Sequence, residues 1–173
     1  MIGLKLLNEN SWNEQYELTL SLHIEGCESA YLTGDFDTME RISAIVLSHA
    51  TSEVEKTRIY VVKILAYTAQ NKPLDAAQVA ISSVNRLGIK LSQKTNKLKI
   101  LHSLIKTKIC LKGKDIQNIA QGPVMNDPML IAANKILSIA GASVYQSLPE
   151  LYAMIVFQRV RMSVKYGNSA ASS

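Results

Sequence analysis

The sequence contains few of the residues that mark secreted, fibrous or membrane-spanning proteins. Its 173 residues include two cysteines, Cys27 and Cys110, eight glycines and four prolines. Two cysteines cannot form a disulfide framework, so we expect a reducing, cytoplasmic environment. Sparse glycine and proline argue against collagen-like, linker-rich and many-turned all-β architectures. The longest strongly apolar run, residues 151–157, is far shorter than the roughly 20 residues that span a bilayer. We expect no signal peptide, because residues 1–7 are too short for its apolar core.

The chain has enough apolar residues for one folded domain. Hydrophobic residues make up 47% of it and charged residues 19%, which excludes an intrinsically disordered protein. The charge is unevenly placed: residues 1–87 hold 7 basic and 11 acidic side chains, whereas residues 88–173 hold 12 and 3. A basic half of this kind is compatible with an anionic partner.

Capping signals predict where helices begin. Ser11 with Glu14, and Ser52 with Glu55, have the spacing of capping boxes, in which each side chain bonds the other residue's amide. Thr95 is a further candidate cap. The pairs 127–128 and 148–149 read as a cap followed by proline at the first helical position.

Glycines predict where helices end. Gly34, Gly88, Gly113 and Gly167 each follow a run of helical periodicity, and glycine tolerates the left-handed conformation that closes a last turn. The expected helices cover residues 12–33, 36–50, 52–70, 73–87, 95–112, 128–147 and 149–166. No segment shows a persuasive period of two, so the expected fold class is all-α.

We expect one helical-repeat domain over residues 11–169, with tails at 1–10 and 170–173. The turn at 34–36 joins two helices and the turn at 71–73 does the same 37 residues later, with an Ala-Tyr pair shortly before each. Tetratricopeptide repeats have a period of about 34 residues. We therefore interpret the chain as a tetratricopeptide-like solenoid of antiparallel helix hairpins, with about seven or eight helices. Degenerate repeat units cover 11–50 and 52–88, and further helices follow at 95–112, 128–147 and 149–166.

Motifs that would indicate catalysis are missing. The sequence has no glycine-rich phosphate loop, no kinase catalytic loop and no nucleophile elbow. Residues 34–37, Gly-Asp-Phe-Asp, are similar to a kinase metal-binding triplet, but the glycine is on the wrong side and a helix-hairpin turn explains them better. We therefore expect no catalytic residue, no cofactor and no small-molecule substrate.

A metal site is not expected either. His23 and Cys27 lie one helical turn apart, but zinc needs about four ligands, and His49, His102 and Cys110 are isolated. We interpret Cys27 as a packed thiol. Asp35 and Asp37 are better explained by capping and exposure than by metal binding.

Eight lysines lie between Lys90 and Lys114, with no acidic and no aromatic residue among them. Nucleic-acid surfaces usually add aromatics that stack on bases. We expect the lysine stems to lie along a buried helix with their ammonium groups in solvent. The alternative is a surface for an acidic protein, a lipid or a nucleic acid.

Two further groups of residues have plain structural explanations. The methionines at 39, 125, 129, 154 and 162 are compatible with an adaptable peptide groove, but methionine at helical spacing is more often core. Trp12 and Tyr16 share a helix face, and we expect them to fix the start of the first helix.

Several segments together resemble a family of very large bacterial signalling proteins, common in cyanobacteria. The similar segments are residues 30–41, 66–76, 87–88, 107–108, 111–114, 125–128 and 165–169. Family members join a serine/threonine kinase, an AAA-like ATPase, helical repeats, a GAF sensor and a histidine kinase. The resemblance covers roughly residues 11–169 and implies the helical region between the ATPase and the sensor. It implies no active-site residue in this chain, which we expect to be a fragment of such a protein.

The expected function is therefore a non-catalytic helical scaffold for protein interaction or inter-domain coupling. Its expected partners are neighbouring signalling domains or a second copy. Self-association is expected through the helix 149–166, because it has a second apolar stripe at Ala153, Phe157, Val160 and Val164 and little follows it to cover that stripe. The alternative is a basic helical protein that binds an anionic membrane or nucleic acid, although we do not expect either partner.

Overall fold

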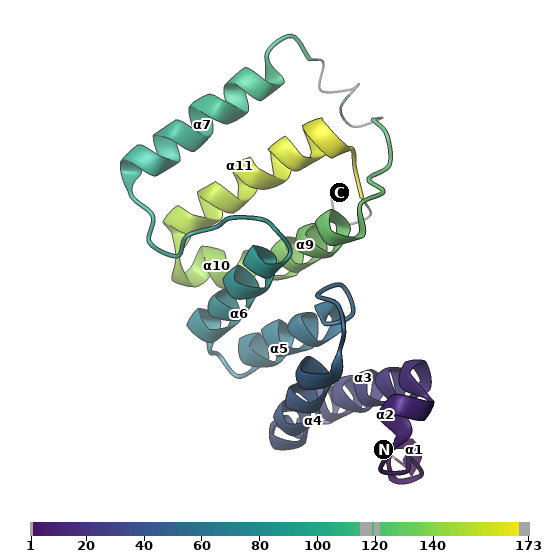
Figure 1. Ribbon diagram of the computed structural model, residues 1–173. Coiled ribbons are helices and arrows are strands. Elements are labelled where there is room, and N and C mark those ends of the chain that lie inside the picture. Colours follow the sequence, from purple (N-terminus) through teal and green to yellow (C-terminus); the bar gives the residue numbers. More distant parts are fainter. Residues whose placement is uncertain (1, 115–118, 120–121, 170–173) are drawn as a thin grey trace.

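The computed structural model describes residues 2–114, 119 and 122–169, and over these residues it is helical (Figure 1). Its helices are α1 (Ile2–Lys5), α2 (Ser11–Glu14), α3 (Tyr16–Leu32), α4 (Phe36–His49), α5 (Thr57–Ala69), α6 (Pro73–Arg86), α7 (Lys97–Leu111), α9 (Pro128–Ile139), α10 (Gly141–Ser147) and α11 (Pro149–Tyr166). The described residues contain no strand, only an isolated parallel bridge between Val124 and Asn168. The prediction of an all-α fold is confirmed for this part of the chain.

The helices are stacked along one long direction. Helices α3 and α4 form a hairpin, and α5 and α6 form a second hairpin beside it. Helices α9 and α10 pack on the second hairpin, α11 packs on α10, and α7 packs on α11. In Figure 1, the N-terminal helices and α7 therefore lie at opposite ends of the molecule.

The position of α7 does not follow the order of the chain. In a stack built strictly in sequence order, the helix after α6 would pack next to α6. Instead, apart from its hairpin partner α5, α6 contacts mainly α10 and α9, while α7 packs along α11 (Figure 1). As a result, a segment from the middle of the sequence forms one end of the stack.

The first two hairpin turns have equivalent geometry. The chain adopts the left-handed conformation at Gly34, with φ of 75°, and at Asn71, with φ of 56°. The next amide donates to the carbonyl five residues back, at 2.9 Å in the first turn and 2.8 Å in the second, which is the Schellman pattern. Ala30 therefore corresponds to Tyr67, which is the same 37-residue offset that separates the two turns in the sequence.

The expected capping box at Ser11 and Glu14 is wrong. Ser11 lies inside α2, and Glu14 accepts hydrogen bonds from the side chains of Asn8 at 3.2 Å and Asn10 at 2.8 Å. The backbone then breaks at Gln15, with φ of −140° and ψ of 52°. The expected helix 12–33 is thus two helices.

The expected tail at residues 1–10 is also partly structured. Helix α1 packs on α3, and the Leu4 side chain covers the Cα of Gly26 so closely that a Cβ there would lie 2.8 Å from it. Residues 170–173, the other expected tail, lie outside the described residues.

Other capping residues agree with the sequence more closely than the helix starts do. Ser52 and Glu55 form the reciprocal box, with bonds of 3.2 Å and 3.1 Å, although α5 begins only at Thr57. Asp127 caps α9 as expected. Asn96 caps α7 in place of Thr95, since its side chain accepts from the Lys99 amide at 2.8 Å.

The expected helix 128–147 is bent by 52° where α9 meets α10. Within the described residues, no single helix is both long enough and apolar enough to cross a bilayer. Helices α9 and α10 reach that length and apolarity only when they are counted together. The inward side chains of the pair are part of the protein core: Ala132, Ala133, Ile136, Leu137, Ala140 and Val144.

Helix α5 lies between two hydrophobic cores. Ile59, Val62 and Ala66 face a core shared with α3 and α4, whereas Tyr60 and Ile64 face a second core that extends to α11. A helix with apolar residues on all sides is expected to be covered on all sides. This helix therefore joins the two halves of the stack.

Candidate interaction surface

The candidate metal and thiol residues have structural roles. Cys27 is fully buried, and burial raises the pKa of its thiol to about 11. The Nδ1 atom of His23 lies 2.8 Å from the Thr19 carbonyl oxygen. Across the described residues, no group of three or more side chains is placed to hold a metal ion. Asp35 caps α4 by accepting from the Thr38 amide at 3.1 Å, and this bond lowers its pKa.

Trp12 stabilises the start of the first hairpin, as expected, and two histidines join it. Its ring stacks on His49, with centroids 4.3 Å apart, and lies 4.9 Å from His23. Tyr16 contacts Trp12 at 6.0 Å and donates to Glu55 at 2.8 Å. These contacts tie α2 and α3 to the segment between α4 and α5.

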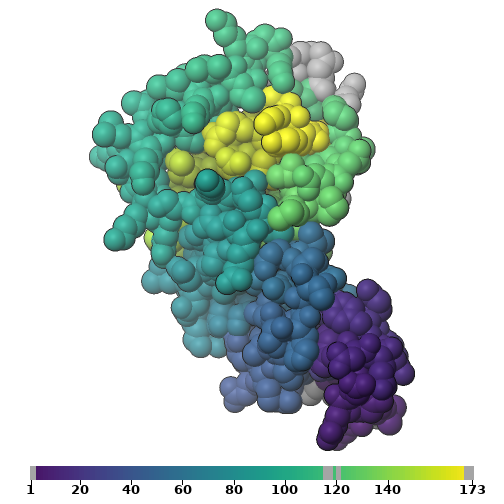
Figure 2. All heavy atoms as spheres, viewed as in Figure 1, coloured from purple at the N-terminus to yellow at the C-terminus, as the bar shows by residue number. Residues whose placement is uncertain are grey.

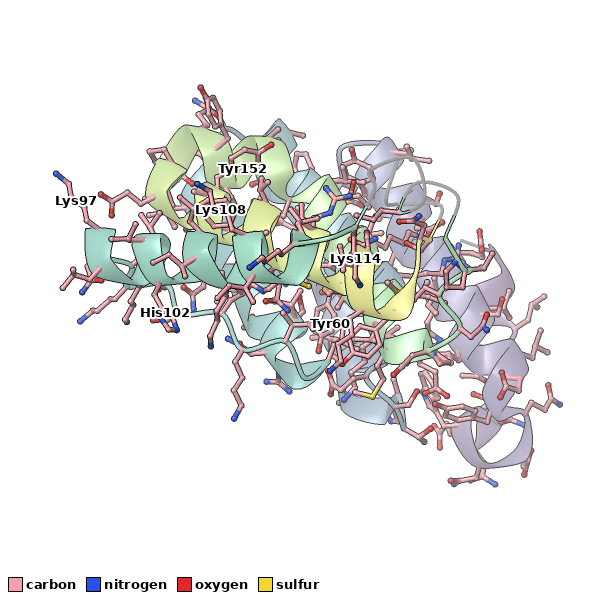
Figure 3. The ribbon with its side chains drawn as sticks, turned by 90° about the horizontal axis from the view of Figure 1, so that it is seen from above. Tyr60, Lys97, His102, Lys108, Lys114 and Tyr152 are labelled. Carbon is pink, nitrogen blue, oxygen red and sulfur yellow. The ribbon has the colours of Figure 1, made fainter. Side chains whose placement is uncertain are left out.

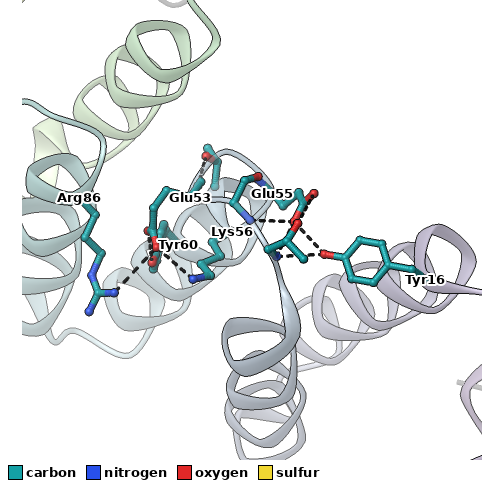
Figure 4. A network of polar contacts seen from close by, with 9 residues as sticks. Tyr16, Glu53, Glu55, Lys56, Tyr60 and Arg86 are labelled. Carbon is teal, nitrogen blue, oxygen red and sulfur yellow. Dashed lines mark hydrogen bonds and ion pairs between the residues drawn. The ribbon is translucent and has the colours of Figure 1, made fainter. Parts of the chain in front are cut away.

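Two carboxylates between α4 and α5 hold neighbouring helices (Figure 4). Glu55 accepts from Tyr16 and from backbone amides, and these bonds outweigh burial, so its pKa is lowered. Glu53 accepts from Tyr60 at 2.9 Å and pairs with Lys56 at 3.0 Å. Burial and the Glu53 bond raise the pKa of Tyr60 to about 12. The hydrogen bonds and ion pairs of Glu53 and Glu55 described here all go to residues of the fold.

The methionines are mostly core. Met39, Met125 and Met162 are buried, which agrees with the plainer interpretation. Met129 is partly exposed at the first turn of α9, and Met154 lines a groove between α7 and α11. They do not form a common groove.

Helix α7 is held to α11 by polar contacts. Its buried side chains are Ser103 and Thr107. Arg161 of α11 donates from Nη1 to Ser103 Oγ at 2.9 Å and to Thr107 Oγ1 at 2.7 Å, and from Nη2 to Gln158 at 2.7 Å. Burial lowers the pKa of this guanidinium. These hydrogen bonds go to uncharged oxygens.

The opposite face of α7 is apolar and exposed. At 3.6 residues per turn, four side chains form a stripe that points away from Ser103 and Thr107. They are Leu98 at 75% exposed, Leu101 at 53%, Ile105 at 47% and Ile109 at 67%. We call this set the outer stripe. The expectation that α7 is a buried helix is therefore wrong, because an apolar face of it lies in solvent; its lysines are exposed, as expected.

Lysines border the outer stripe on both sides. Lys97 and Lys108 lie along one side, and Lys99 and Lys106 lie along the other, on the helical wheel. All four are exposed. Figure 3, which views the molecule from above, shows Lys108 and His102 on opposite flanks of α7. The surface is thus a hydrophobic ridge between two basic flanks.

A groove of about 390 Å³ runs beside this ridge, between α7 and α11. Lys99, His102 and Lys106 line it from α7, and Met154 and Arg161 line it from α11. It has basic groups and no acidic side chain in its lining. We call the outer stripe, its lysine flanks and this groove the α7 surface. Helix α7 lies at the upper end of the molecule in Figure 2.

The second apolar stripe of α11 is half-buried. Its side chains are Ala153, Phe157, Val160 and Val164, and α7 packs along α11. One neighbour of α11 therefore comes from earlier in the sequence. Self-association through α11 stays a prediction. A more exposed apolar stripe lies on α7.

No known family model matches the chain, and comparisons with curated proteins and with solved structures find no significant match.

Proposed function

We propose that the protein is a non-catalytic, tetratricopeptide-like helical scaffold that binds other proteins. In the signalling family that the sequence resembles, such a region would couple the ATPase and sensor modules in the cytoplasm. We propose that this chain is a fragment with that role.

The observation that supports this proposal is the α7 surface. Exposed apolar patches bordered by polar residues are typical of interaction sites. The outer stripe places four large aliphatic side chains in solvent on a helix whose buried residues, Ser103 and Thr107, accept hydrogen bonds from Arg161. The two equivalent turns at Gly34 and Asn71 support the repeat interpretation, although the position of α7 departs from sequential stacking.

The proposal is tested by binding. The purified chain is titrated against purified ATPase and sensor modules of the signalling class by calorimetry. We expect saturable binding to at least one module and no nucleotide hydrolysis by the chain alone. Absence of binding to every module, or turnover that co-purifies with the chain, contradicts the proposal.

The second candidate function is binding of an anionic membrane or nucleic acid. The exposed lysines on both flanks of α7 favour it. Titration with DNA, RNA and anionic vesicles separates the two functions, because phosphate-driven binding weakens steeply as salt rises.

A further inference from the structure

We propose that the α7 surface binds an acidic amphipathic helix of a protein partner. In this complex, the partner's apolar side chains pack on the outer stripe and its carboxylates pair with the lysine flanks. This inference rests on the proposed scaffold function and names the surface and the chemistry of the partner.

The spacing of the outer stripe indicates a helix as the occupant. Its residues, at positions 98, 101, 105 and 109, are separated by three, four and four. This spacing gives a straight seam about three helical turns long, the pattern along which a second helix packs. The other helices of the described fold also pack against helices.

The charge pattern indicates that the partner helix is acidic. Residues beside an apolar seam set the choice of partner through charge. Both flanks of the outer stripe are lysine, and residues 90–114 contain no acidic side chain that would neutralise them. A helix with glutamates on both sides of its own seam is complementary to this surface.

The groove gives the partner a second point of recognition. Arg161 is partly buried there, and it donates hydrogen bonds to the oxygens of Ser103, Thr107 and Gln158. Arginine binds carboxylates strongly when it is shielded from solvent. One carboxylate of the partner can therefore enter between Lys99 and Lys106 and reach this guanidinium.

A membrane surface fits the α7 surface less well. Helices that lie in the membrane interface usually carry tryptophan or phenylalanine in their apolar face. Residues 90–114 contain no aromatic side chain. A peptide partner needs only aliphatic contacts and charge, which are both present.

The test uses the full chain and a designed probe peptide of about 18 residues, or five helical turns. The peptide has leucines along one seam and glutamates on both sides of it. A second peptide carries lysine in place of every glutamate. We expect the acidic peptide to bind with a dissociation constant of about 10 to 100 μM and the basic peptide to bind at least tenfold more weakly, by roughly 1.4 kcal/mol or more.

Charge reversal tests the flanks. In the double variant Lys99→Glu with Lys106→Glu, we expect binding of the acidic peptide to fall about tenfold and binding of the basic peptide to rise. The matched control is Lys72→Glu with Lys135→Glu, which changes the same net charge at exposed lysines outside α7. The control should change affinity by less than about threefold. If both double variants weaken binding of the acidic peptide equally, the change reflects the net charge of the protein and the proposal is overturned.

Removal of apolar side chains tests the outer stripe. We expect Leu101→Ser with Ile105→Ser to weaken binding about tenfold or more. Leu18→Ser with Leu32→Ser removes two exposed leucines from α3 and should leave binding unchanged. Circular dichroism of each variant confirms that the chain is folded.

Two results would overturn the inference. One is that neither peptide binds the folded chain. The other is that vesicles of phosphatidylserine and phosphatidylcholine bind it, with sensitivity to the α7 variants, while the acidic peptide does not; the occupant is then a membrane. If an ATPase or sensor module still binds the α7 variants normally, the scaffold function stands and only this inference fails. If no module binds, both fail.

Discussion

Arg161 makes three hydrogen bonds to α7, so Arg161→Ala should release α7 from α11. The guanidinium donates to the Ser103 carbonyl at 3.2 Å, to Ser103 Oγ at 2.9 Å and to Thr107 Oγ1 at 2.7 Å. Ser103 and Thr107 are the buried residues of α7. Removing the guanidinium therefore removes the polar contacts at the centre of this interface.

The loss of stability expected in Arg161→Ala follows from these hydrogen bonds. A hydrogen bond that involves a charged group contributes about 1.5–3 kcal/mol, and three such bonds converge on one turn of α7. Part of this contribution is offset because burial disfavours the charged guanidinium, as its lowered pKa indicates. We expect a net loss of about 2–3 kcal/mol, which is a factor of about 30 to 160 in the local opening equilibrium.

Hydrogen–deuterium exchange checks this prediction residue by residue. Amides of α7 should exchange about 30- to 160-fold faster in Arg161→Ala, while amides of α3, α4 and α5 keep their rates. The matched control is Arg86→Ala, since Arg86 is 62% exposed and lies 3.9 Å from Glu53. It should change stability by less than about 0.5 kcal/mol. Unchanged exchange in α7, or equal acceleration in the N-terminal hairpin, would refute the reasoning.

Three further predictions concern residues outside α7. Gly167→Ala should destabilise the fold by about 3 kcal/mol or more in urea unfolding, because φ is 90° and a Cβ would lie 2.0 Å from the Pro123 carbonyl oxygen; a wild-type midpoint would contradict this. Cys27 should not react with a thiol reagent at neutral pH until the chain is unfolded, since burial raises its pKa to about 11; rapid native labelling of Cys27, located by mass spectrometry, would disprove it. Glu55 should contribute stability that is present at neutral pH and is lost as pH falls through its lowered folded pKa, because hydrogen bonds from Tyr16 and backbone amides outweigh burial. Glu55→Gln should therefore flatten the acid side of a plot of Tm against pH, and an unchanged acid side would count against it.

Local signals in the sequence predicted the hairpins well. A left-handed residue followed by a cap or a proline, as at Gly34 and Pro73, depends only on neighbouring residues. Helix starts that depend on competing side chains were less predictable. Glu14 has the right spacing from Ser11, but asparagines before the helix occupy its carboxylate.

The candidate surface could be predicted only in part. The cluster of lysines and its lack of aromatics were visible in the sequence. The position of α7 was not, since nothing local to residues 97–111 indicates that α11 lies beside them. The contact between Arg161 and Ser103 spans 58 residues, and it places a polar seam where the helical wheel alone would favour leucine and isoleucine.

Helix α7 exposes its apolar outer stripe to solvent, and this exposure sets the free energy that a partner can gain by covering it. The outer stripe leaves exposed the equivalent of about two and a half aliphatic side chains, and burying one such side chain contributes about 1.5–3 kcal/mol. A partner that covers the stripe therefore gains at most about 4–7 kcal/mol before ordering costs. That upper bound is about twice the roughly 2–3 kcal/mol expected for loss of the Arg161 contacts. Because the partner helix and α11 would hold opposite faces of the same helix, partner binding should also slow hydrogen exchange in α7, and Arg161→Ala should weaken partner binding while leaving the outer stripe chemically intact.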